Sequence, residues 1–429
     1  MASGRRADLG QPLHAAPARL FRPERAPSDA PHPDQGRSAA RLNSHMSAQV
    51  APRRISETPP KLAIERVEVF GVAVPLAGGG FKNAYVTKTV QKSAVVRVTA
   101  AGGAVGLGNI DPSPGYSTEA IEESLAALRG KLAPCVIGAD AANIHVLNAR
   151  LDAAAPGFLD AKAAIEMACV DLTARALGVP VYTYLGGAVK ERLSFNAWIG
   201  ILPPEEAAAE ARKWFERGFR SAKIKVGGGI EADRDRVKAV REAVGSEMAL
   251  RIDANAGYDA DTAIRLARSV QACDLQHFEQ PVAARDLAGM ARVRREAGGV
   301  PIMADESVLD HASLIAVIKA GAADIVKLKV MKQGGFHRTA AMLATAEAAG
   351  VRCVIGHGFG LGVNTMAEIM LAATSANVID GLECVGPLKT VDDITTEKLD
   401  LGAGVLALPP GPGLGVALDE AKLARYRFA

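Results

Sequence analysis

The sequence predicts an α/β protein in which a (β/α)₈-type barrel follows a separate N-terminal α+β domain. Charged residues recur after short apolar runs, at Lys225, Asp253, Glu279, Asp305 and Lys329, in steps of 28, 26, 26 and 24 residues. A unit of that length fits one strand, one helix and the return to the next strand. The region before these units instead contains strands followed by helices, without alternation. Because the chemistry of such barrels lies at the C-terminal strand ends, the charges should converge at one mouth.

The expected elements follow the chain in order. A three-stranded meander at 62–76, 93–103 and 105–111 precedes helices at 117–132, 142–154 and 160–178. Eight strand positions then follow, with helices such as 204–218 and 339–350 between them: 193–200, 221–227, 249–255, 275–281, 301–307, 324–330, 353–358 and 381–387. We predict an α+β domain at 61–186, the barrel at 187–395, and a segment at 396–429 that returns to the first domain.

Residues 1–60 differ in composition from the rest of the chain. They hold nine Arg, no Lys, nine of the 23 Pro and one aromatic residue. So little apolar surface cannot form a core, and we expect either a disordered tail or a start assigned upstream of Met46.

Composition argues against several classes of protein. Residues 61–429 carry 41 basic and 42 acidic residues. This part of the chain therefore lacks the net positive charge that would favour binding to nucleic acid. No run of 18 apolar residues and no signal-peptide core is present, which favours a cytoplasmic protein without membrane contact. The five cysteines stand far apart and predict reduced structural thiols.

Three acidic residues follow strands of consecutive units: Asp253 in "RIDAN", Glu279 in "FEQP" and Asp305 in "ADES". A single carboxylate at a strand end is often a helix cap or an ion-pair partner. Three close together repel one another unless a cation neutralises them. Monodentate carboxylates suit Mg²⁺, with Mn²⁺ as a substitute, better than zinc.

Lysines flank these carboxylates. Lys223 and Lys225 lie two apart on one strand and therefore point the same way, into the mouth. We expect Lys225 to act as a base, its pKa lowered by burial, by Lys223 and by the metal. On the opposite side, Lys327 and Lys329 in "KLKVMKQGG" also share a direction, and geometry alone leaves either as the second acid/base group.

From Leu62 onward the chain resembles the enolase superfamily, and within it the muconate-lactonizing (muconate cycloisomerase) subgroup. The resemblance rests on "KIK", "DAN", "FEQP", "ADES", "LKVMKQGG" and the ending "GPGLGVALDEAKL". It implies a modified (β/α)₇β barrel under a capping domain, with Asp253, Glu279 and Asp305 as Mg²⁺ ligands. It also implies Lys225 as base on the second strand and Lys329, three before Lys332, as acid/base on the sixth.

The resemblance implies removal of a proton α to a carboxylate, through an enediolate that Mg²⁺ stabilises. Among the activities that the resemblance implies, a muconate cycloisomerase-like activity is the first expectation. An amino-acid, N-acyl-amino-acid or dipeptide racemase or epimerase is the second, and an acid dehydratase is the third. The chain departs from muconate cycloisomerases at Gly360, where they carry a glutamate, and from dipeptide epimerases at Glu383, where they carry paired aspartates. A barrel that has lost its chemistry and only binds or supports a partner is the remaining alternative.

Further residues are expected to support the site or to contact a small-molecule carboxylate substrate. His357 and Glu383 follow the seventh and eighth strand positions, and each has a structural alternative as a satisfied core histidine or as an ion-pair partner of an arginine. The expected set is Asn255, Glu306, His357, Phe359 and Glu383 in the barrel, with Phe81, Tyr85 and Tyr116 from the first domain. The resemblance also implies a homo-oligomer.

Overall fold

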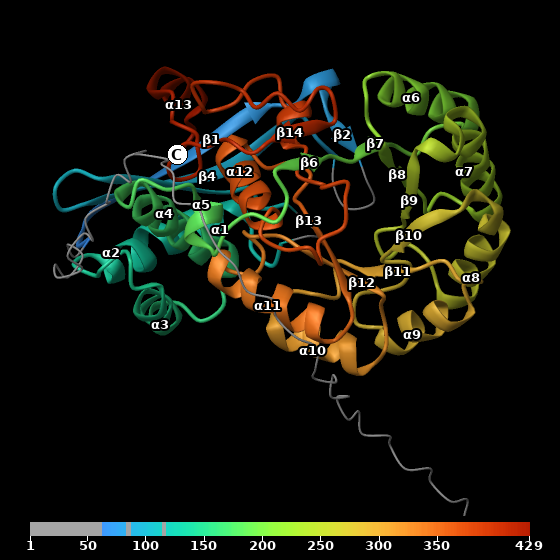
Figure 1. Ribbon diagram of the computed structural model, residues 1–429, viewed down its shortest axis with the longest axis horizontal. Coiled ribbons are helices and arrows are strands. Elements are labelled where there is room, and N and C mark those ends of the chain that lie inside the picture. The colour runs from blue at the N-terminus through green and yellow to red at the C-terminus, as the bar shows by residue number, and fades with distance from the viewer. Residues whose placement is uncertain (1–61, 83–86, 114–116) are drawn as a thin grey trace, which may run out of the picture. The chain divides into compact units, whose positions relative to one another are not determined.

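The computed structural model describes residues 62–82, 87–113 and 117–429 (Figure 1). The prediction for residues 1–60 concerns a segment outside these ranges. The two-part fold is confirmed: an N-terminal α+β capping domain precedes a curled parallel sheet covered by helices. The exact boundaries between the parts remain a prediction.

The capping domain begins with the predicted meander. Strands β1 (Ile64–Pro75), β4 (Val90–Ala100) and β5 (Val105–Ile110) form an antiparallel sheet in the order β1-β4-β5. Two short strands, β2 (Phe81–Lys82) and β3 (Thr87–Lys88), pair beside it. The helices of this domain are α1 (Ile121–Ala127), α2 (Ala133–Val136), α3 (Ile144–Ala154), α4 (Leu159–Ala176) and α5 (Val181–Tyr184).

Helix α4 packs against β5 at very short range because the strand offers glycines at the contact. A Cβ atom on Gly108 would lie 1.8 Å from the backbone oxygen of Ala164, and one on Gly106 would lie 2.0 Å from that of Ala168. The facing positions of α4 are small as well, since Ala161, Ala164 and Ala168 are fully buried. Small residues on both sides therefore let the helix backbone touch the strand.

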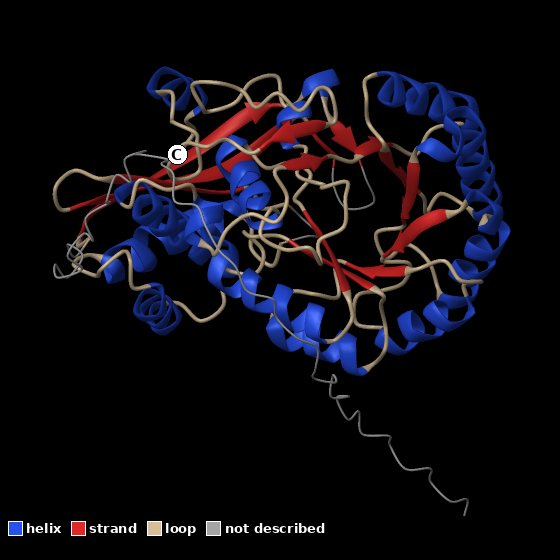
Figure 2. Ribbon diagram, viewed as in Figure 1, coloured by secondary structure: helices blue, strands red, loops and turns tan. Residues whose placement is uncertain are grey.

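The barrel is a seven-stranded parallel sheet in the order β13-β12-β11-β10-β9-β8-β7. Figure 2 shows helices on the outside of these strands. The strands, preceded by β6 (Arg192–Ser194), are β7 (Ala197–Ile199), β8 (Ser221–Lys225), β9 (Ala249–Asp253), β10 (Leu275–Glu279), β11 (Ile302–Ala304), β12 (Ile325–Leu328) and β13 (Arg352–Ile355). The helices are α6 (Pro204–Glu216), α7 (Ile230–Val244), α8 (Ala260–Ser269), α9 (Leu287–Glu296), α10 (His311–Lys319), α11 (Phe336–Ala348) and α12 (Gly362–Ala372).

The eighth strand position, predicted at 381–387, differs from a regular strand. Leu382 forms a single parallel bridge with Phe195, and the Glu383 N–H donates to the Ile355 carbonyl at 3.0 Å. These bonds join the segment to both neighbours, so it closes the ring without forming a strand of its own. It then turns into a 3₁₀ helix at Gly386–Leu388, which removes the regular pairing.

The C-terminal segment returns to the start of the described chain. Strand β14 (Val405–Ala407) pairs with β6, and helix α13 (Glu420–Tyr426) contacts β1. The Gly71 N–H donates to the Ala429 carbonyl at 2.9 Å. The last residues thus attach to the first strand of the capping domain.

Buried polar contacts join the capping domain to the barrel. Glu166 of α4 accepts the backbone N–H groups of Phe336 and His337, both at 2.8 Å, at the start of α11. Asn364 of α12 donates to Asp111, which follows β5, at 2.9 Å. These contacts fix the capping domain against the βα loops that surround the barrel mouth.

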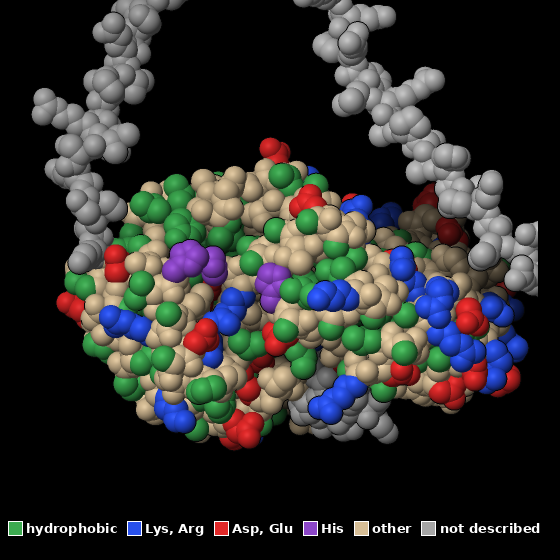
Figure 3. All heavy atoms as spheres, turned by 90° about the horizontal axis from the view of Figure 1, so that it is seen from below, with side chains coloured by type: hydrophobic (Ala, Val, Ile, Leu, Met, Phe, Trp, Pro, Cys, Tyr) green, Lys and Arg blue, Asp and Glu red, His purple; other side chains and the backbone are tan. Residues whose placement is uncertain are grey.

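Basic and acidic side chains are interspersed on the face shown in Figure 3. Within the described ranges, no helix is both long and apolar enough to cross a membrane.

We expect Gly108→Ala to destabilise the protein by about 3 kcal/mol, because the added methyl group collides with the α4 backbone rather than with a movable side chain. Gly130→Ala is the matched control. Gly130 lies in the helical stretch Leu128–Leu132 with no atom near its missing Cβ, so alanine should stabilise slightly. Urea unfolding of both variants measures the difference, and equal midpoints would contradict the packing argument.

Candidate active site

The three predicted carboxylates form one buried row, and strand register is the reason. Asp253 and Glu279 are the last residues of β9 and β10, while Asp305 directly follows β11. Parallel pairing sets Lys225 opposite Asp253 and Asp253 opposite Glu279. All three carboxylates are 0% exposed. The sheet therefore forces like charges together where water cannot screen them.

Two lysines insert between the carboxylates. Lys223 Nζ lies 2.9 Å from a Glu279 oxygen and 3.2 Å from Asp253. Lys327 Nζ lies 3.1 Å from the other Glu279 oxygen and 3.6 Å from Asp305. Each ammonium thus bridges two members of the row and offsets part of their mutual repulsion.

Two further lysines lie at the two ends of the row. Lys225 Nζ, from the end of β8, donates to Asp253 Oδ2 and to Asn255 Oδ1, both at 2.6 Å. Lys329, directly after β12, donates to Asp305 Oδ1. Since β8 and β12 flank β9, β10 and β11 in the sheet, these two amines approach the row from opposite sides.

The row sets the protonation of its members. Burial by itself raises the pKa of Asp253, but Lys225 and Lys223 outweigh burial and lower that pKa to about 2. Burial, reinforced by Asp253, raises the pKa of Glu279 to about 8. Burial lowers the pKa of Lys329 to about 8 against the opposing effect of Asp305.

Lys225 behaves differently from the sequence-based expectation. Burial lowers its pKa, but Asp253 and Glu279 outweigh burial, and the net shift of the Lys225 pKa is upward. The expected lowering is therefore absent in this arrangement, because the contact to Asp253 stabilises the ammonium form.

Glu279 and two neighbouring side chains form a group that could hold a metal ion. His277, Glu279 and Glu383 each bring one ligand atom to within 4.8 Å of the others, and all three side chains are buried. Among the described residues, neither ring nitrogen of His277 has a hydrogen-bond partner, and burial holds the pKa of this histidine well below its usual range. Asp305 Oδ2 is likewise a buried oxygen without a hydrogen bond from that part of the chain. These oxygen and nitrogen atoms fit a divalent cation.

The backbone beside the row is strained. Asn255, Ala256 and Gln280 have φ values of 45°, 62° and 34°, which residues other than glycine rarely adopt. Gln280 Oε1 accepts the backbone N–H of Asp305 at 3.1 Å, and Gln280 Nε2 donates to Ser307 at 2.9 Å. Gln280 therefore holds the β11 loop, a role that the "FEQP" motif alone did not reveal.

Glu383 lies inside the ion-pair network. It accepts hydrogen bonds from Lys223 and Lys327, and Arg251 Nη1 approaches it at 3.3 Å. The sequence predicts either a substrate contact or an ion pair with an arginine for Glu383, and the ion pair with an arginine is present. Arg251 is itself fully buried and also donates to the Gly381 carbonyl at 2.7 Å, which ties β9 to the eighth strand position.

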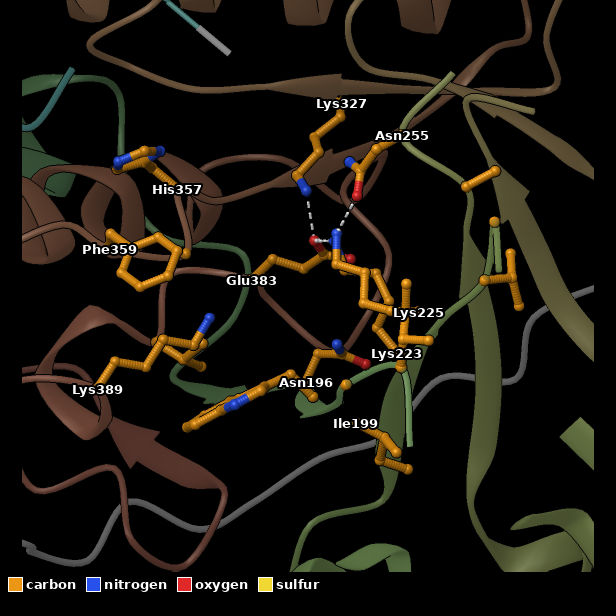
Figure 4. A pocket seen from close by; sticks show the side chains of 18 of the residues that line it. Asn196, Ile199, Lys223, Lys225, Asn255, Lys327, His357, Phe359, Glu383 and Lys389 are labelled. Carbon is orange, nitrogen blue, oxygen red and sulfur yellow. Dashed lines mark hydrogen bonds and ion pairs between the residues drawn. The ribbon is translucent and has the colours of Figure 1, made fainter. Parts of the chain in front are cut away.

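A cavity of about 1030 Å³, the open space at its mouth included, lies beside the lysines that contact the row (Figure 4). Its polar lining includes the lysines Lys223, Lys225, Lys327 and Lys329. Its apolar lining includes Trp198, Ile199, Ile201 and Phe359, and His357 and Lys389 also line it. In Figure 4, Phe359 and Lys389 lie across the cavity from Lys225 and Asn255.

The other predicted residues fall into two groups. Asn255 Nδ2 donates to Glu306 Oε1 at 3.2 Å, and Asn255 Oδ1 accepts from Lys225. Glu306 thus helps to position Asn255, which contacts Lys225 directly. His357 lines the cavity, and its backbone N–H donates to Glu368. Its Nε2 atom has no hydrogen-bond partner within the described ranges. The side chains of Phe81, Tyr85 and Tyr116 lie outside the described part of the protein.

Sequence reasoning missed several residues of the site. His277 stands two before Glu279, and the two-residue period of a strand was a usable signal that both point inward. Trp198 could have been found in the same way on the first barrel strand. No local pattern pointed to Lys389, since it reaches the cavity from the loop after the 3₁₀ helix Gly386–Leu388.

Comparisons with known proteins agree with this fold. Residues 65–186 match the family described as "Mandelate racemase / muconate lactonizing enzyme, N-terminal domain", and residues 206–422 match "Enolase C-terminal domain-like". The chain therefore belongs to the mandelate racemase/muconate lactonizing enzyme family of the enolase superfamily. The relatives that this chain resembles are isomerases, and this chain is an isomerase as well.

Relatives with different reactions are equally similar. Chloromuconate cycloisomerase of Cupriavidus pinatubonensis is 33% identical over 79% of this chain and 92% of its own length. The structure of N-succinyl Arg/Lys racemase from Bacillus cereus superposes with a TM-score of 0.82 at 30% identity, covering 86% of this chain and 98% of that one. Dipeptide epimerase from Enterococcus faecalis, complexed with Mg and L-Leu-L-Tyr, gives 0.79 at 31% identity, covering 83% and 99%.

We expect Arg251→Met to destabilise the protein by about 3–5 kcal/mol, because the buried Glu383 carboxylate and two backbone carbonyls lose a charged donor. Arg265→Met on the surface of α8 should change stability by less than about 0.5 kcal/mol. Denaturant unfolding compares the two; a small effect at Arg251 would show that the closure of the ring does not depend on it.

Proposed function

We propose that this protein is a metal-dependent isomerase that moves a proton on and off the carbon α to a substrate carboxylate, with Lys225 and Lys329 as the acid/base groups. One observation carries the proposal. The two amines contact the outer members of a carboxylate row from opposite sides. A substrate carbon held over the row would present one face to each lysine.

Asp253, Glu279 and Asp305 are the ligands that we propose for Mg²⁺. Three carboxylates give the hard oxygen ligands that Mg²⁺ prefers, whereas the alternative set includes the imidazole of His277. Both sets share Glu279. A divalent cation there supplies the positive charge that a weak carbon acid requires when its proton leaves. Lys223 and Lys327 contribute further positive charge beside the same oxygens.

Inversion at the α-carbon, as in a racemase or epimerase of N-acyl amino acids or dipeptides, fits the paired lysines best. One lysine removes the proton from one face and the other returns a proton to the opposite face. The volume of the cavity and its apolar lining residues are compatible with an acylated amino acid of moderate size.

Cycloisomerisation, the first expectation from the sequence, is the second candidate, and the similarity to chloromuconate cycloisomerase favours it. The chain lacks the glutamate of those enzymes at Gly360. A Cβ atom there would lie 3.0 Å from Asn364 Nδ2 and 3.2 Å from Thr365 Oγ1, so the site has little room for a longer side chain. For cycloisomerisation, another group of this protein would have to take over the role of that glutamate.

A cytoplasmic location and assembly into a homo-oligomer complete the proposal. The five cysteines are all free thiols, four of them buried, as suits a reducing compartment.

Metal binding is tested by thermal unfolding with and without Mg²⁺. At 100 times its dissociation constant, Mg²⁺ should stabilise the protein by about 2.7 kcal/mol. Asp305→Asn should lose this stabilisation, while His277→Leu and the surface control Glu347→Gln should keep it. If His277→Leu loses the stabilisation by Mg²⁺ and Asp305→Asn keeps it, the metal is assigned to His277, Glu279 and Glu383 instead.

Exhaustive chelation of the metal should abolish α-proton exchange, and full exchange in the chelated protein would end the metal proposal.

The lysine roles are tested by proton NMR in D₂O with each enantiomer of an N-acyl amino acid. Lys225→Ala should slow exchange of one enantiomer by about 10²–10⁴-fold, and Lys329→Ala should do so for the other. Lys319→Ala on the surface serves as control, with circular dichroism to verify folding. Undiminished exchange of both enantiomers in both variants would refute the assignment.

A further inference from the structure

A glycine run follows Lys225, and the proposed chemistry does not use it. Val226 and Gly227 line the cavity, and Gly228 and Gly229 lead into helix α7. Gly227 and Gly229 have φ values of 113° and 136°, which glycine adopts without steric cost. Because glycine also loses the most conformational freedom when it is fixed, this loop needs contacts that hold it. The loop begins directly after the lysine that we propose as an acid/base group.

One buried carboxylate holds this loop. Asp233, in the first turn of α7, is 0% exposed. Its Oδ2 atom accepts the backbone N–H groups of Gly227 at 2.9 Å and of Gly228 and Gly229, both at 3.0 Å. Three consecutive N–H groups therefore converge on one oxygen, an arrangement that favours an anion. Since a carboxylate of the chain itself occupies this place, the loop is fixed from within and is not open to an anionic ligand.

Arg236 connects this carboxylate to the lysine. Its Nη1 atom donates to Asp233 Oδ1 and, at 3.1 Å, to the backbone carbonyl of Lys225. Its Nε atom donates to the Leu202 carbonyl, in the loop after β7, at 2.5 Å. Both members of the ion pair are buried, so the loss of either would leave a charge without compensation. The backbone of Lys225 is therefore tied to α7 through Asp233 and Arg236.

Tyr258 extends the network to the loop after β9. Its hydroxyl donates to Asp233 Oδ2 and accepts the Gly227 N–H at 2.8 Å. Burial, reinforced by Asp233, raises the pKa of Tyr258, so the hydroxyl keeps the proton that it donates. Three residues earlier in this loop, Asn255 Oδ1 accepts from Lys225 Nζ at 2.6 Å (Figure 4). The network thus reaches the backbone of Lys225 directly and its amine through the loop of Asn255.

The two loops also approach each other closely at glycine positions. A Cβ atom on Gly257 would lie 2.8 Å from the Ala254 carbonyl oxygen and 3.7 Å from Gly227 Cα. All three residues line the cavity together with Asn255 and Lys225. Asp233, Arg236 and Tyr258 are not among the residues of the described ranges that line it. The network therefore supports this wall of the cavity without forming part of it.

We propose that Asp233, acting through Arg236 and Tyr258, is a positioning residue for Lys225 that fixes the approach of its amine to one face of the substrate α-carbon. The inference rests on the proposed function and deepens it. Proton transfer depends steeply on the placement of the base, and a displacement of about 1 Å can lower the rate by about 100-fold.

The lysine at the other end of the row has a support of its own. The Lys329 N–H donates to Gln333 Oε1 at 2.6 Å, and Gln333 Nε2 donates to the Val308 carbonyl at 3.2 Å. These contacts join the loops after β12 and β11, whereas the Asp233 network joins those after β7, β8 and β9. Loss of the Asp233 network should therefore impair proton transfer by Lys225 and spare transfer by Lys329.

The test measures the initial rate of α-proton exchange in D₂O for both enantiomers of N-succinyl-leucine, or of whichever N-acyl amino acid the unaltered protein exchanges fastest. The readout is the ratio of the two rates, which does not depend on the fraction of folded protein. Lys225→Ala identifies the enantiomer whose proton Lys225 removes. Asp233→Asn should slow that enantiomer by about 10–100-fold relative to the other. Tyr258→Phe, which removes a single hydroxyl, should slow it by about threefold or more.

Two controls accompany these variants. Lys238→Met, on the exposed side of α7, should leave both rates unchanged. Gln333→Met removes a buried polar side chain beside Lys329 and should not slow the Lys225 enantiomer selectively. A selective loss there would show that any damage near the site moves the ratio, and would overturn the proposal.

Asp233→Asn decides the outcome, and Tyr258→Phe decides it if the first variant does not fold. A ratio within about twofold of that in the unaltered protein would overturn the proposal.

A measurement without substrate separates this inference from the proposed function. In protein whose lysines carry ¹³C at Cε, the NMR resonance of Lys225 is the one that Lys225→Arg removes. It should shift in Asp233→Asn and in Tyr258→Phe, while the Lys329 resonance stays. If it shifts in this way but Lys225→Ala slows neither enantiomer, the positioning role stands and the proposed reaction fails. If Lys225→Ala slows one enantiomer but neither network variant changes the ratio, the proposed reaction stands and the positioning role is overturned.

Discussion

The register of the parallel sheet is the constraint on which the site depends. It aligns Lys225, Asp253 and Glu279 across neighbouring strands and brings Asp305 beside them, so that like charges share a volume from which water is excluded. Such a row cannot exist without compensation, because unscreened carboxylates repel strongly. The sequence compensates with lysines two residues apart on β8 and β12, each pair giving one ammonium inside the row and one at its end. A period of two along a strand is thus enough to supply both the neutralising charge inside the row and the amines at its ends.

The same network explains how the barrel closes. The eighth strand position forms only an isolated bridge, and Glu383 and Arg251 connect it to the rest of the ring through buried ion pairs and carbonyl contacts. Charged residues here have a structural role as well as a chemical one. Removing a single partner would leave a buried charge without compensation, which costs more than the pair itself contributes. Stability and chemistry are therefore coupled in this part of the protein.

The lysines that line the cavity have two kinds of surroundings. Lys223, Lys225, Lys327 and Lys329 contact carboxylates, whereas Lys389 Nζ lies against the rings of Phe359 and Trp198. A Cβ atom on Gly386 would lie 1.9 Å from the Gly360 carbonyl oxygen, so glycine at position 386 lets the loop before Lys389 touch the loop after Phe359. Relatives named for different reactions are similar to this chain to nearly the same extent, so overall similarity does not distinguish among those reactions.

Spacing in the sequence determined the barrel, its strand ends and the central carboxylates, because a repeat of about 26 residues and a period of two along strands are local properties of the chain. The resemblance of its motifs to a family added the choice of Lys329 over Lys327. Tertiary structure decided what local patterns cannot encode. It showed that Asp253 raises the Lys225 pKa, that Glu383 meets Arg251, and that His277 lies among the ligand atoms around Glu279. It also brought Lys88 to Phe359 across about 270 residues of chain, a contact that depends on how the capping domain packs on the barrel loops and that no spacing rule describes.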